Sequence, residues 1–468
     1  MLCELYPTNK IKYKRMKDFL SNFGESIIAF GNFMWGAPLL ILLLGGGLFL
    51  FFYSRLIPLK YMGHGLKVLR GKYDNPDEPG QISHYQAVST ALAATVGMGN
   101  ISGIAIAIAT GGPGAVFWMW ISALIGVSTK FFTCSLAVMY RGKDSEGNLQ
   151  GGPMYVIKHG LKKYWHWLAI VFSIAGMIGV TPIFQANQLT QAIRDVVLIP
   201  NGVETGFTTD LISGLVMSGL VILVLFGGIK RIAKVARLMV PMMVIVYVVA
   251  LLYILASNSS EVIPGFKLII TDAFTGDAVL GGALGSLIVV GVRRAAFSNE
   301  AGIGTAPMAH GAAKTSEPIR EGLAAMFEPI IDTIIVCTMT ALAIIVTGAW
   351  TDTSLDGIGL TVQAFSIAMP GFGPYILMLC VIVFAVTTMF AFPYYGAKCF
   401  SFLFGAKRKN IYHIFYVLII PIGATSTLAA VIGLIDGAYA TMAFPTMISA
   451  IILAPKVLKA AKKYFAKI

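Results

Sequence analysis

The amino-acid sequence predicts an all-α integral membrane protein with eleven transmembrane helices. Three observations lead to this class: of the 468 residues, 57% are hydrophobic, only 12% are charged, and the mean hydropathy is +0.78. A soluble domain has about 25% charged residues. The composition therefore excludes a soluble enzyme, a disordered or fibrous chain and a nucleic-acid-binding module. Since one span needs about 20 apolar residues, the chain has room for ten or more.

The net charge and the cysteines indicate neither a polyanion partner nor a metal centre. The formal charge of +13 comes from 35 Lys and Arg against 22 Asp and Glu, and in a membrane protein such an excess is typical of cytoplasmic loops. The five cysteines are scattered, without a CxxC pair or a His at ligand spacing, so no disulfide framework or zinc site is predicted. We therefore expect no cofactor, and no metal other than a transported ion.

Apolar stretches bounded by charged residues or by Pro and Gly clusters define the predicted spans. The first span, at 34–54, follows an N-terminal tail at 1–33 and stands apart from the rest. A basic tail at 456–468 follows the last span. The ten core spans lie at 83–109, 113–139, 167–198, 210–229, 236–256, 281–311, 322–349, 373–404, 411–431 and 434–455.

The Lys and Arg residues predict the orientation, because they concentrate in cytoplasmic loops. Alternate connections hold 25 of the 35, whereas the opposite set holds little beyond Arg194 and Lys267. We therefore expect a multi-pass protein of a prokaryotic inner cell membrane, with a cytoplasmic C-terminus and, for an odd number of spans, an N-terminus outside. The basic connections are 54–82, 140–166, 230–237, 314–320, 398–409 and the tail from Lys456.

The basic stretch from Lys10 to Lys17 does not fit this orientation, because an outer N-terminus would place five positive charges outside. Two explanations stay open: a short tail is tolerated as an exception, or translation begins at Met16, which removes four of the five charges. The stretch is not predicted to be a signal peptide, because no cleavage site follows the first long apolar run.

The ten core spans divide into two blocks of nearly equal length. The blocks, 83–256 and 281–455, contain 174 and 175 residues. Five is an odd number, so the second block enters the membrane from the opposite side. Inverted repeats of this kind mark secondary transporters, in which substrate binds near the midplane at discontinuous helices in matching places of the two halves. The first span of each block should therefore be broken.

Each of these leading spans contains a run of Gly and small polar residues near its middle. The first run reads TVGMGNISG at 95–103, and the second reads SNEAGIGTAP at 298–307. Each Gly weakens a helix by about 1 kcal/mol, and Pro307 suits the first turn of a new half-helix with Thr305 as its cap. Helix N-termini at such breaks favour a carboxylate, and unwound carbonyls favour an ammonium group or Na⁺. The alternative is that these glycines serve close helix packing.

Four sequence motifs are long or distinctive enough to compare with known families. They read GNI at 99–101, GGPGAVFWMWISALIG at 111–126, GGPMY at 151–155 and FSNEAGIGTAPMAHGAAK at 297–314. Together they resemble the alanine or glycine:cation symporter family, also called the sodium:alanine symporters. The resemblance implies a LeuT-type five-plus-five inverted-repeat core with broken first and sixth core helices, preceded by one extra helix, and uptake of alanine or glycine with Na⁺.

The same resemblance implies the residues that bind substrate and ion. Amides of the first break would receive the substrate carboxylate, and the second break would hold the amino group and a small side chain. Phe392 occupies a position where the family often has Trp, so the substrate range stays open. The implied substrate residues are Gly97, Gly99, Asn100, Gln185, Ser298, Ile303, Gly304 and Phe392, and the implied sodium residues are Ala93, Val96, Thr387 and Thr388.

Ionisable residues inside the spans are functional candidates by default. Glu300 has three open roles: a cation ligand, a proton carrier, or a carboxylate that accepts hydrogen bonds within the break. Arg293 and Arg294 would pair with Glu300, form an outer gate contact, or extend to the surface. Glu328 and Asp332 lie at i and i+4 on one helix face, where we expect a helix-packing network.

The sequence therefore predicts a sodium-coupled symporter that imports small neutral amino acids by alternating access. Proton coupling through Glu300 is the alternative within the same class. An intramembrane enzyme is the remote alternative, because it needs a convergent His, acidic or Cys cluster, and His310 has no second His nearby in sequence. A passive channel is disfavoured because the sequence contains no repeated filter motif.

Overall fold

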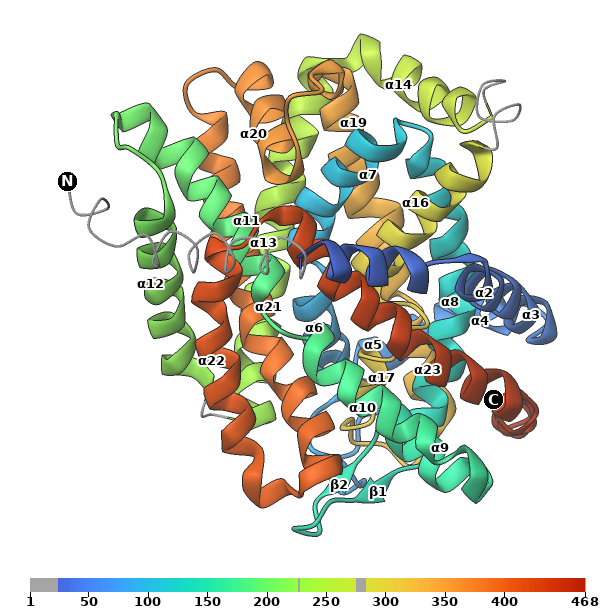
Figure 1. Cartoon of the computed structure of the whole chain (residues 1–468). Coiled ribbons are helices and arrows are strands. Elements are labelled where there is room, and N and C mark those ends of the chain that lie inside the picture. The colour runs from blue at the N-terminus through green and yellow to red at the C-terminus, as the bar shows by residue number, and fades with distance from the viewer. Residues whose placement is uncertain (1–23, 226–227, 275–282, 468) are drawn as a thin grey trace, which may run out of the picture.

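The computed structural model is a bundle of helices (Figure 1), and it describes residues 24–225, 228–274 and 283–467. Among these residues, six helices are long and apolar enough to cross a membrane, or up to eight if each of two bent pairs is one span. The all-α membrane class is thus confirmed, while the count of eleven spans stays a prediction. The basic stretch from Lys10 to Lys17, including Met16, lies outside the described residues.

The helices follow the order of the predicted spans. The first half contains α2 (Ala37–Leu40), the π-helix η1 (Ile41–Gly45), α3 (Gly46–Tyr53), α4 (Ile57–Lys60), α5 (Met62–Leu69), α6 (His84–Thr95), the π-helix η2 (Gly99–Gly103), α7 (Ile104–Gly111), α8 (Ala115–Met139), α9 (Pro153–Gly160), α10 (Trp167–Gly179), α11 (Ile183–Ile193), the π-helix η4 (Arg194–Leu198), α12 (Phe207–Leu225) and α13 (Gly228–Ser257). The second half contains α14 (Ser259–Asp272), α16 (Ala283–Asn299), α17 (Ala306–His310), α18 (Pro318–Ala325), the π-helix η6 (Ile330–Cys337), α19 (Thr338–Val346), α20 (Gly357–Ala368), α21 (Gly373–Phe404), α22 (Lys409–Thr425) and α23 (Leu428–Phe465). Short 3-10 helices lie at Lys163–Trp165, Ile199–Asn201, Ala349–Thr351 and Ala406–Arg408.

A small antiparallel hairpin joins α8 to α9. Its strands are β1 (Gly142–Lys143) and β2 (Leu149–Gln150), and Gly142 pairs with Gln150. The end of the molecule that carries this hairpin is called the hairpin side below; it is the lower end in Figure 1.

Several helices lie where the sequence predicts connections: α4, α5 and α9 lie in the basic connections 54–82 and 140–166, and α14 and α20 lie in the opposite set. α14 and α20 have 14 and 12 residues, fewer than a span needs, and both lie at the end opposite the hairpin (Figure 1). α20 is attached to α11, because the Ile358 amide donates a 2.9 Å hydrogen bond to Gln188 Oε1. Their apolar residues are too few to define a span, so the hydropathy pattern did not predict them.

Helix extends further at both ends of the described chain than the sequence predicts. A helix at Gly24–Met34, within the predicted tail, meets the helix Ala37–Tyr53 at an angle of 44°. At this bend the buried Trp35 donates through Nε1 to the Asp436 carbonyl, at 2.9 Å. α23 continues through most of the predicted basic tail, because Tyr464 packs on α5, with its hydroxyl 2.8 Å from His64 Nε2.

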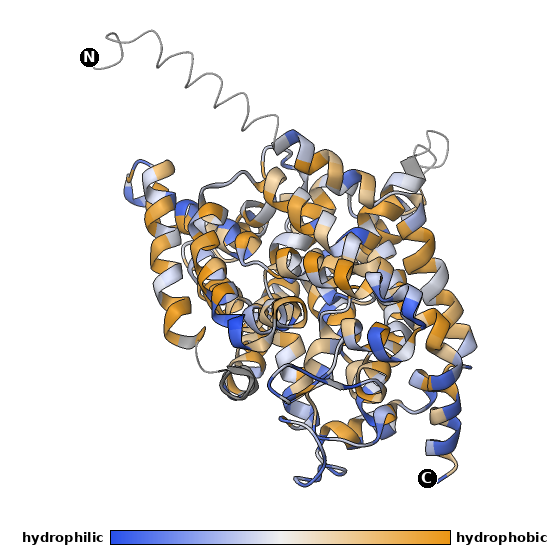
Figure 2. Cartoon of the chain, turned by 60° about the horizontal axis from the view of Figure 1, so that its bottom comes forward, coloured by the Kyte–Doolittle hydropathy of each residue, from blue (hydrophilic) through white to orange (hydrophobic). Residues whose placement is uncertain are grey.

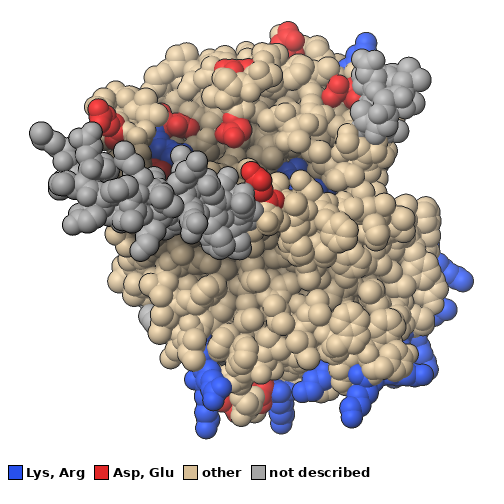
Figure 3. Space-filling view, viewed as in Figure 1, with Lys and Arg blue, Asp and Glu red and all other residues tan. Residues whose placement is uncertain are grey.

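Charged and apolar side chains separate along the molecule. Lys and Arg gather along the edge on the hairpin side, and Asp and Glu lie mainly at the opposite end (Figure 3). Between them, hydrophobic residues cover the outward faces of helices (Figure 2); Leu223 of α12 and Leu238 of α13 are 69% and 75% exposed. An apolar belt of this kind lies in lipid.

Both predicted helix breaks are present. α6 ends at Thr95, Val96 is extended, and the chain then turns by 53° into the helix Gly99–Gly111. The second break separates α16 from α17 and has positive φ at Glu300 (+54°), Gly302 (+85°) and Gly304 (+108°). At the last two positions this backbone conformation favours glycine.

The second break also shows how its two flanks are held. Pro307 lies in the first turn of α17, as predicted, and Thr305 occupies the N-cap position. The Thr305 hydroxyl, however, donates to the Glu300 carboxylate and does not cap an amide, so its predicted capping role is wrong. The open side of Gly302 lies against Leu43 of η1 and Met447 of α23.

Candidate functional site

The two helix breaks meet in the interior of the bundle. A Cβ atom on Gly99 would lie 3.3 Å from the Cα atom of Ser298, so the two backbones are nearly in contact. Asn100 Nδ2 lies 3.3 Å from Ser298 Oγ, and Asn100 Oδ1 accepts a 2.8 Å bond from the Gly97 amide. Asn100 and Ser298 are fully buried. The structure therefore brings together four of the predicted substrate residues.

A buried carboxylate, Asp332, connects these residues. It accepts hydrogen bonds from Asn100 Nδ2 (2.9 Å), Ser298 Oγ (2.6 Å) and Thr333 Oγ1 (2.8 Å). Its side chain is fully buried, and a carboxylate at membrane depth needs such donors or a cation nearby. Asp332 thus contacts both breaks, although the sequence indicated for it a packing role shared with Glu328.

Asp332 and Glu328 have different partners and lie in different helical segments. Asp332 lies in η6, whereas Glu328 precedes it and contacts Lys130 and His310. Helical segments with i→i+5 hydrogen bonds are rare and are frequent at functional sites. The sequence signal that could have singled out Asp332 was an acidic residue inside an apolar span.

The predicted sodium residues are only partly brought together. Thr388 Oγ1 donates a 3.1 Å hydrogen bond to the Ala93 carbonyl. A Cβ atom added to Gly97 would lie 2.6 Å from Thr388 Oγ1. Val96, which lies between Ala93 and Gly97 in the sequence, has an extended backbone. Thr387 points elsewhere: its hydroxyl bonds carbonyls of its own helix and lies 3.5 Å from Met243 Sδ of α13.

The remaining predicted substrate residues lie around the breaks in tightly packed surroundings. A Cβ on Gly304 would lie 2.4 Å from Thr446 Oγ1 and 2.7 Å from the Phe172 ring, and the Ile303 carbonyl accepts from the same Thr446 hydroxyl at 3.0 Å. Gln185 of α11 is buried, and its Oε1 has no hydrogen-bond partner in the described part of the chain. Phe392 of α21 is buried with its ring centroid 6.4 Å from that of Tyr395.

Glu300 has a structural set of contacts in this conformation. Its carboxylate accepts from the Thr305 hydroxyl and, at 2.8 Å, from the Tyr439 hydroxyl of α23. Arg293 and Arg294 do not pair with it; both bind the Asp436 carboxylate, Arg293 at 2.6 Å. The ion pair with Glu300 is therefore wrong for both arginines, and extension to the surface is wrong for Arg294, which is buried.

An aromatic pair lies between this ion-pair cluster and the breaks. Phe297 packs edge-on against Phe184, with centroids 4.7 Å apart, and its ring lies 5.1 Å from the Arg294 guanidinium. A Cβ on Gly99 would lie 3.6 Å from the same ring. On this side, the end opposite the hairpin, packed side chains cover the breaks.

A cavity of about 790 Å³ opens on the hairpin side. Among the described residues, its lining includes Pro393, next to Phe392, and none of the predicted substrate or sodium residues. It lies between the hairpin, α21 and α22, with charged and polar lining residues Asp144, Glu146, Gln150, Lys398, Lys409 and His413. The structure thus has a buried site at the breaks and a separate cavity, lined in part by these polar residues, on the hairpin side.

Comparison with known proteins identifies the family. The model of the sodium:alanine symporter family matches residues 21–468. The chain belongs to the sodium:alanine symporter family. Members of this family are transporters and not enzymes, so the class of amino-acid and cation symport, which the motifs implied, is confirmed.

Relatives of this symporter match it over almost the whole chain. Sodium/alanine symporter AgcS of Methanococcus maripaludis is 38% identical over 448 residues, which cover 95% of this chain and 97% of that protein. Probable sodium/glutamine symporter GlnT of Bacillus subtilis is 33% identical over 446 residues, covering 94% and 90%.

A solved structure of low sequence identity shares the fold of this chain. The crystal structure of MhsT in complex with L-phenylalanine superimposes with a TM-score of 0.58 at 13% sequence identity, covering 81% of this chain and 98% of that one. This similarity supports the predicted LeuT-type fold of the chain as a whole.

Proposed function

We propose that this protein is a sodium-coupled symporter that imports small neutral amino acids, alanine and glycine, by alternating access. The observation that carries the proposal is the meeting of the two helix breaks at Asn100, Ser298 and Asp332, with the Thr388–Ala93 contact beside the first break. Free backbone groups and one carboxylate at that point offer partners for a zwitterion and for a cation.

The first break holds the substrate carboxylate in this proposal. Binding at the amides of Gly97 and Gly99 would take the Gly97 amide from Asn100 Oδ1, which it now contacts at 2.8 Å. The freed amide oxygen of Asn100 would then be available to a cation. Ser298 and the carbonyls that follow it would hold the ammonium group, near the charge of Asp332.

A small side chain fits the second break best. The surroundings of Gly304 are tightly packed, because a Cβ atom added to this residue would lie 2.4 Å from Thr446 Oγ1 and 2.7 Å from the Phe172 ring. Ile303 and Phe392 would form apolar walls of the substrate pocket. Gln185 Oε1, which has no hydrogen-bond partner among the described residues, would be available to the substrate. We therefore propose alanine and glycine as substrates and expect larger amino acids to bind more weakly.

The coupling ion in this proposal is Na⁺. The Thr388 hydroxyl and the carbonyls of Ala93 and Val96 form a group of oxygens of the kind that hard cations prefer. Thr387 would join the group if its side chain rotated away from Met243. Na⁺ binding and substrate binding would each raise the affinity for the other through the shared first break.

The proposed orientation of the molecule in the membrane follows from its charges. The Lys and Arg residues along the hairpin side favour that side as cytoplasmic (Figure 3). The polar cavity then lies on the route to the cytoplasm, and the Phe184–Phe297 pair lies on the outer route. We further propose eleven spans, with an outer N-terminus and with inverted repeats at 83–256 and 281–455, in an inner cell membrane.

Uptake of labelled alanine into proteoliposomes tests the proposal. We expect uptake driven by an inward Na⁺ gradient and none when K⁺ replaces Na⁺. We expect Thr388→Ala to raise the Na⁺ concentration for half-maximal uptake about tenfold, equivalent to about 1.4 kcal/mol, and Thr387→Ala to raise it less.

Thr425→Ala is the matched control, because that hydroxyl bonds carbonyls of its own helix, α22, away from the breaks. It should leave the Na⁺ dependence unchanged. Equal uptake with Na⁺ and K⁺ outside would refute sodium coupling, and equal effects of Thr388→Ala and Thr425→Ala would refute the sodium site.

A further inference from the structure

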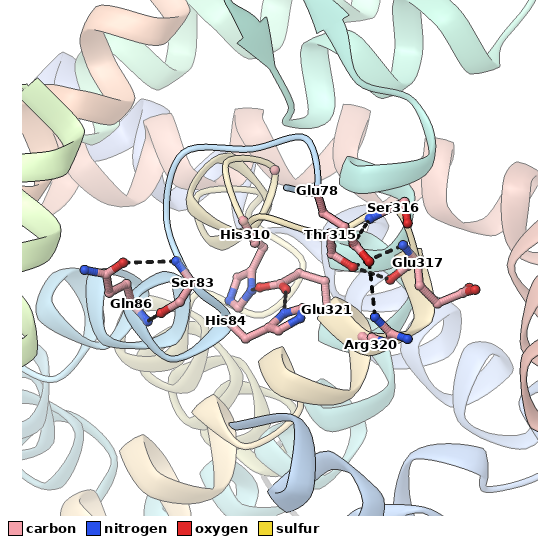
Figure 4. Close-up of polar contacts among 12 residues, drawn as sticks. Glu78, Ser83, His84, Gln86, His310, Thr315, Ser316, Glu317, Arg320 and Glu321 are labelled. Atoms are coloured by element: carbon pink, nitrogen blue, oxygen red, sulfur yellow. Dashed lines mark hydrogen bonds and ion pairs between the residues drawn. The ribbon is translucent and has the colours of Figure 1, made fainter. Parts of the chain in front are cut away.

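Five ionisable side chains form a continuous chain of contacts on the hairpin side of the breaks. His84 Nδ1 contacts one Glu321 oxygen, and His310 Nδ1 contacts the other at 2.6 Å. His310 Nε2 lies 2.5 Å from Glu328 Oε1, and Glu328 Oε2 lies 2.6 Å from Lys130 Nζ. We call these five residues the latch. Figure 4 shows the His84 and His310 rings both directed at the Glu321 carboxylate.

The latch is buried, and each of its contacts joins two of its own members; His84 Nε2 has no hydrogen-bond partner among the described residues. All five side chains are at most 1% exposed. His310 contacts a carboxylate oxygen at each ring nitrogen, so each contact must contain a proton. With both of these protons on His310, the set balances two cations, Lys130 and His310, against two carboxylates, and such pairing makes the burial of these charges tolerable. Among the described residues, no group suited to a metal ion is present.

The latch connects both broken helices to two continuous ones. His84 is the first residue of α6, and His310 is the last residue of α17. Glu321 and Glu328 lie in or just after α18, and Lys130 lies in the middle of α8. One carboxylate, Glu321, therefore holds the hairpin-side halves of both broken spans.

The position of His84 gives α6 the geometry of a lever. The helix is a rod of 12 residues, with the break at Val96 at one end and His84 at the other. A capping box between Ser83 and Gln86 fixes the backbone at the His84 end (Figure 4). Rotation of α6 about the break would move its far end most, and the His84–Glu321 contact lies at that far end.

This motion would uncover the side of α6 that packs toward Tyr394 of α21. Ala87 of α6 is fully buried in a small apolar cluster against which Tyr394 packs, and Tyr394 lines the cavity. A displacement of α6 away from α21 would therefore expose Ala87 to water on the hairpin side.

We propose that Glu321 is a positioning residue for opening of the site toward the hairpin side. Its carboxylate holds α6 through His84 and α17 through His310, and the His84 contact must break before α6 can rotate about its break. This inference rests on the proposed alternating access but assigns a role to residues outside the substrate and sodium sites.

The reaction rate of a single engineered cysteine tests the proposal in the full-length protein in membranes. All five native cysteines are replaced by Ala, Ala87→Cys is introduced, and the rate of labelling by N-ethylmaleimide is measured. We expect Glu321→Gln to raise this rate at least tenfold, because Gln keeps one acceptor but loses the charge that binds both histidines. His84→Gln, which leaves the rest of the latch intact, should raise it similarly.

Asp210→Asn is the matched control, because it breaks the Arg194–Asp210 ion pair of 2.8 Å, which does not involve α6 or α17. It should leave labelling unchanged. If Glu321→Gln does not fold, His84→Gln answers the same question. An unchanged labelling rate in a folded latch variant, or an equal increase in Asp210→Asn, would overturn the proposal.

Transport kinetics separate the latch from the proposed function. In the latch variants we expect the KM for alanine to stay within about twofold and the maximal rate to change, because the substrate contacts are intact. If the protein binds no alanine at all, the proposed function fails, yet the labelling experiment still reports on the latch.

Discussion

Individual buried side chains differ sharply in what they contact, and those contacts separate structural from functional candidates. Asp332 and Glu300 are both carboxylates next to the second break, and both are buried. Asp332 binds Asn100 and Ser298, one from each break, whereas Glu300 binds hydroxyls of Thr305 and Tyr439. We infer that Asp332 acts on the ligands and that Glu300 maintains the shape of the break.

Replacement of these two carboxylates by their amides provides a matched pair. Asp332→Asn puts a donor where Asn100 and Ser298 already donate, and such a mismatch costs about 1–3 kcal/mol. We expect Na⁺-dependent alanine uptake to fall by about tenfold or more, whereas Glu300→Gln, which keeps one acceptor, should retain Na⁺ dependence. The measurement is initial uptake against Na⁺ concentration at several pH values.

The same measurement decides on proton coupling. If Glu300 carried a transported proton, Glu300→Gln would abolish the pH dependence of uptake and leave it Na⁺-independent. Unchanged Na⁺-dependent uptake in Asp332→Asn would contradict the role of Asp332.

At the scale of elements, the broken helices were predictable and their partners were not. The runs of Gly at 95–103 and 298–307 predict the breaks because glycine destabilises helix locally. The π-helix η6 and the latch depend on contacts between residues far apart in sequence: His84 and Glu321 are separated by 237 residues. Lys130 and His84 could have been recognised as candidates, because they are ionisable residues in apolar spans. The residues that they contact could not be predicted from the sequence.

Gly304 tests how rigidly the second break is packed. At φ +108° a residue other than glycine costs about 1–3 kcal/mol, and a new Cβ would lie 2.4 Å from Thr446 Oγ1. We expect Gly304→Ala to lower the melting temperature of the purified protein by several degrees and to abolish uptake.

Gly219→Ala is the control for this substitution, because Gly219 lies in α12 and a Cβ atom added there would have nothing within 4 Å. It should leave uptake unchanged and leave the melting temperature equal or higher, since Ala favours helix. A Gly304→Ala protein with normal stability and uptake would show that the break is looser than its contacts indicate.

At the scale of the whole molecule, composition and charge predicted the class, but not every helix. The low charge and the apolar runs predict a helical membrane protein, and the motifs predict its family. Helices α14 and α20 were missed because short helices outside the lipid carry no long apolar run. The segments at Gly24–Met34 and beyond Lys456 are helical because Trp35 and Tyr464 find partners in distant elements.

The orientation of the molecule gives a further prediction. With the hairpin side cytoplasmic, a cysteine at Glu146, at the exposed tip of the hairpin, should react with a membrane-impermeant maleimide only after cells are opened. A cysteine at Thr353, beyond α19 at the opposite end, should react in intact cells. The reverse pattern would contradict the orientation, with both substitutions made in the cysteine-free protein.

The contact of Leu43 with Gly302 has a consequence for the surroundings of the protein. Leu43 belongs to a helix whose neighbours Ile41 and Phe52 are 71% and 68% exposed. One leucine therefore separates acyl chains from the unwound peptide groups of the second break. A bilayer that is thinner or thicker than this helix prefers would tilt it, and the tilt would be transmitted to the substrate pocket, so turnover should vary with acyl-chain length.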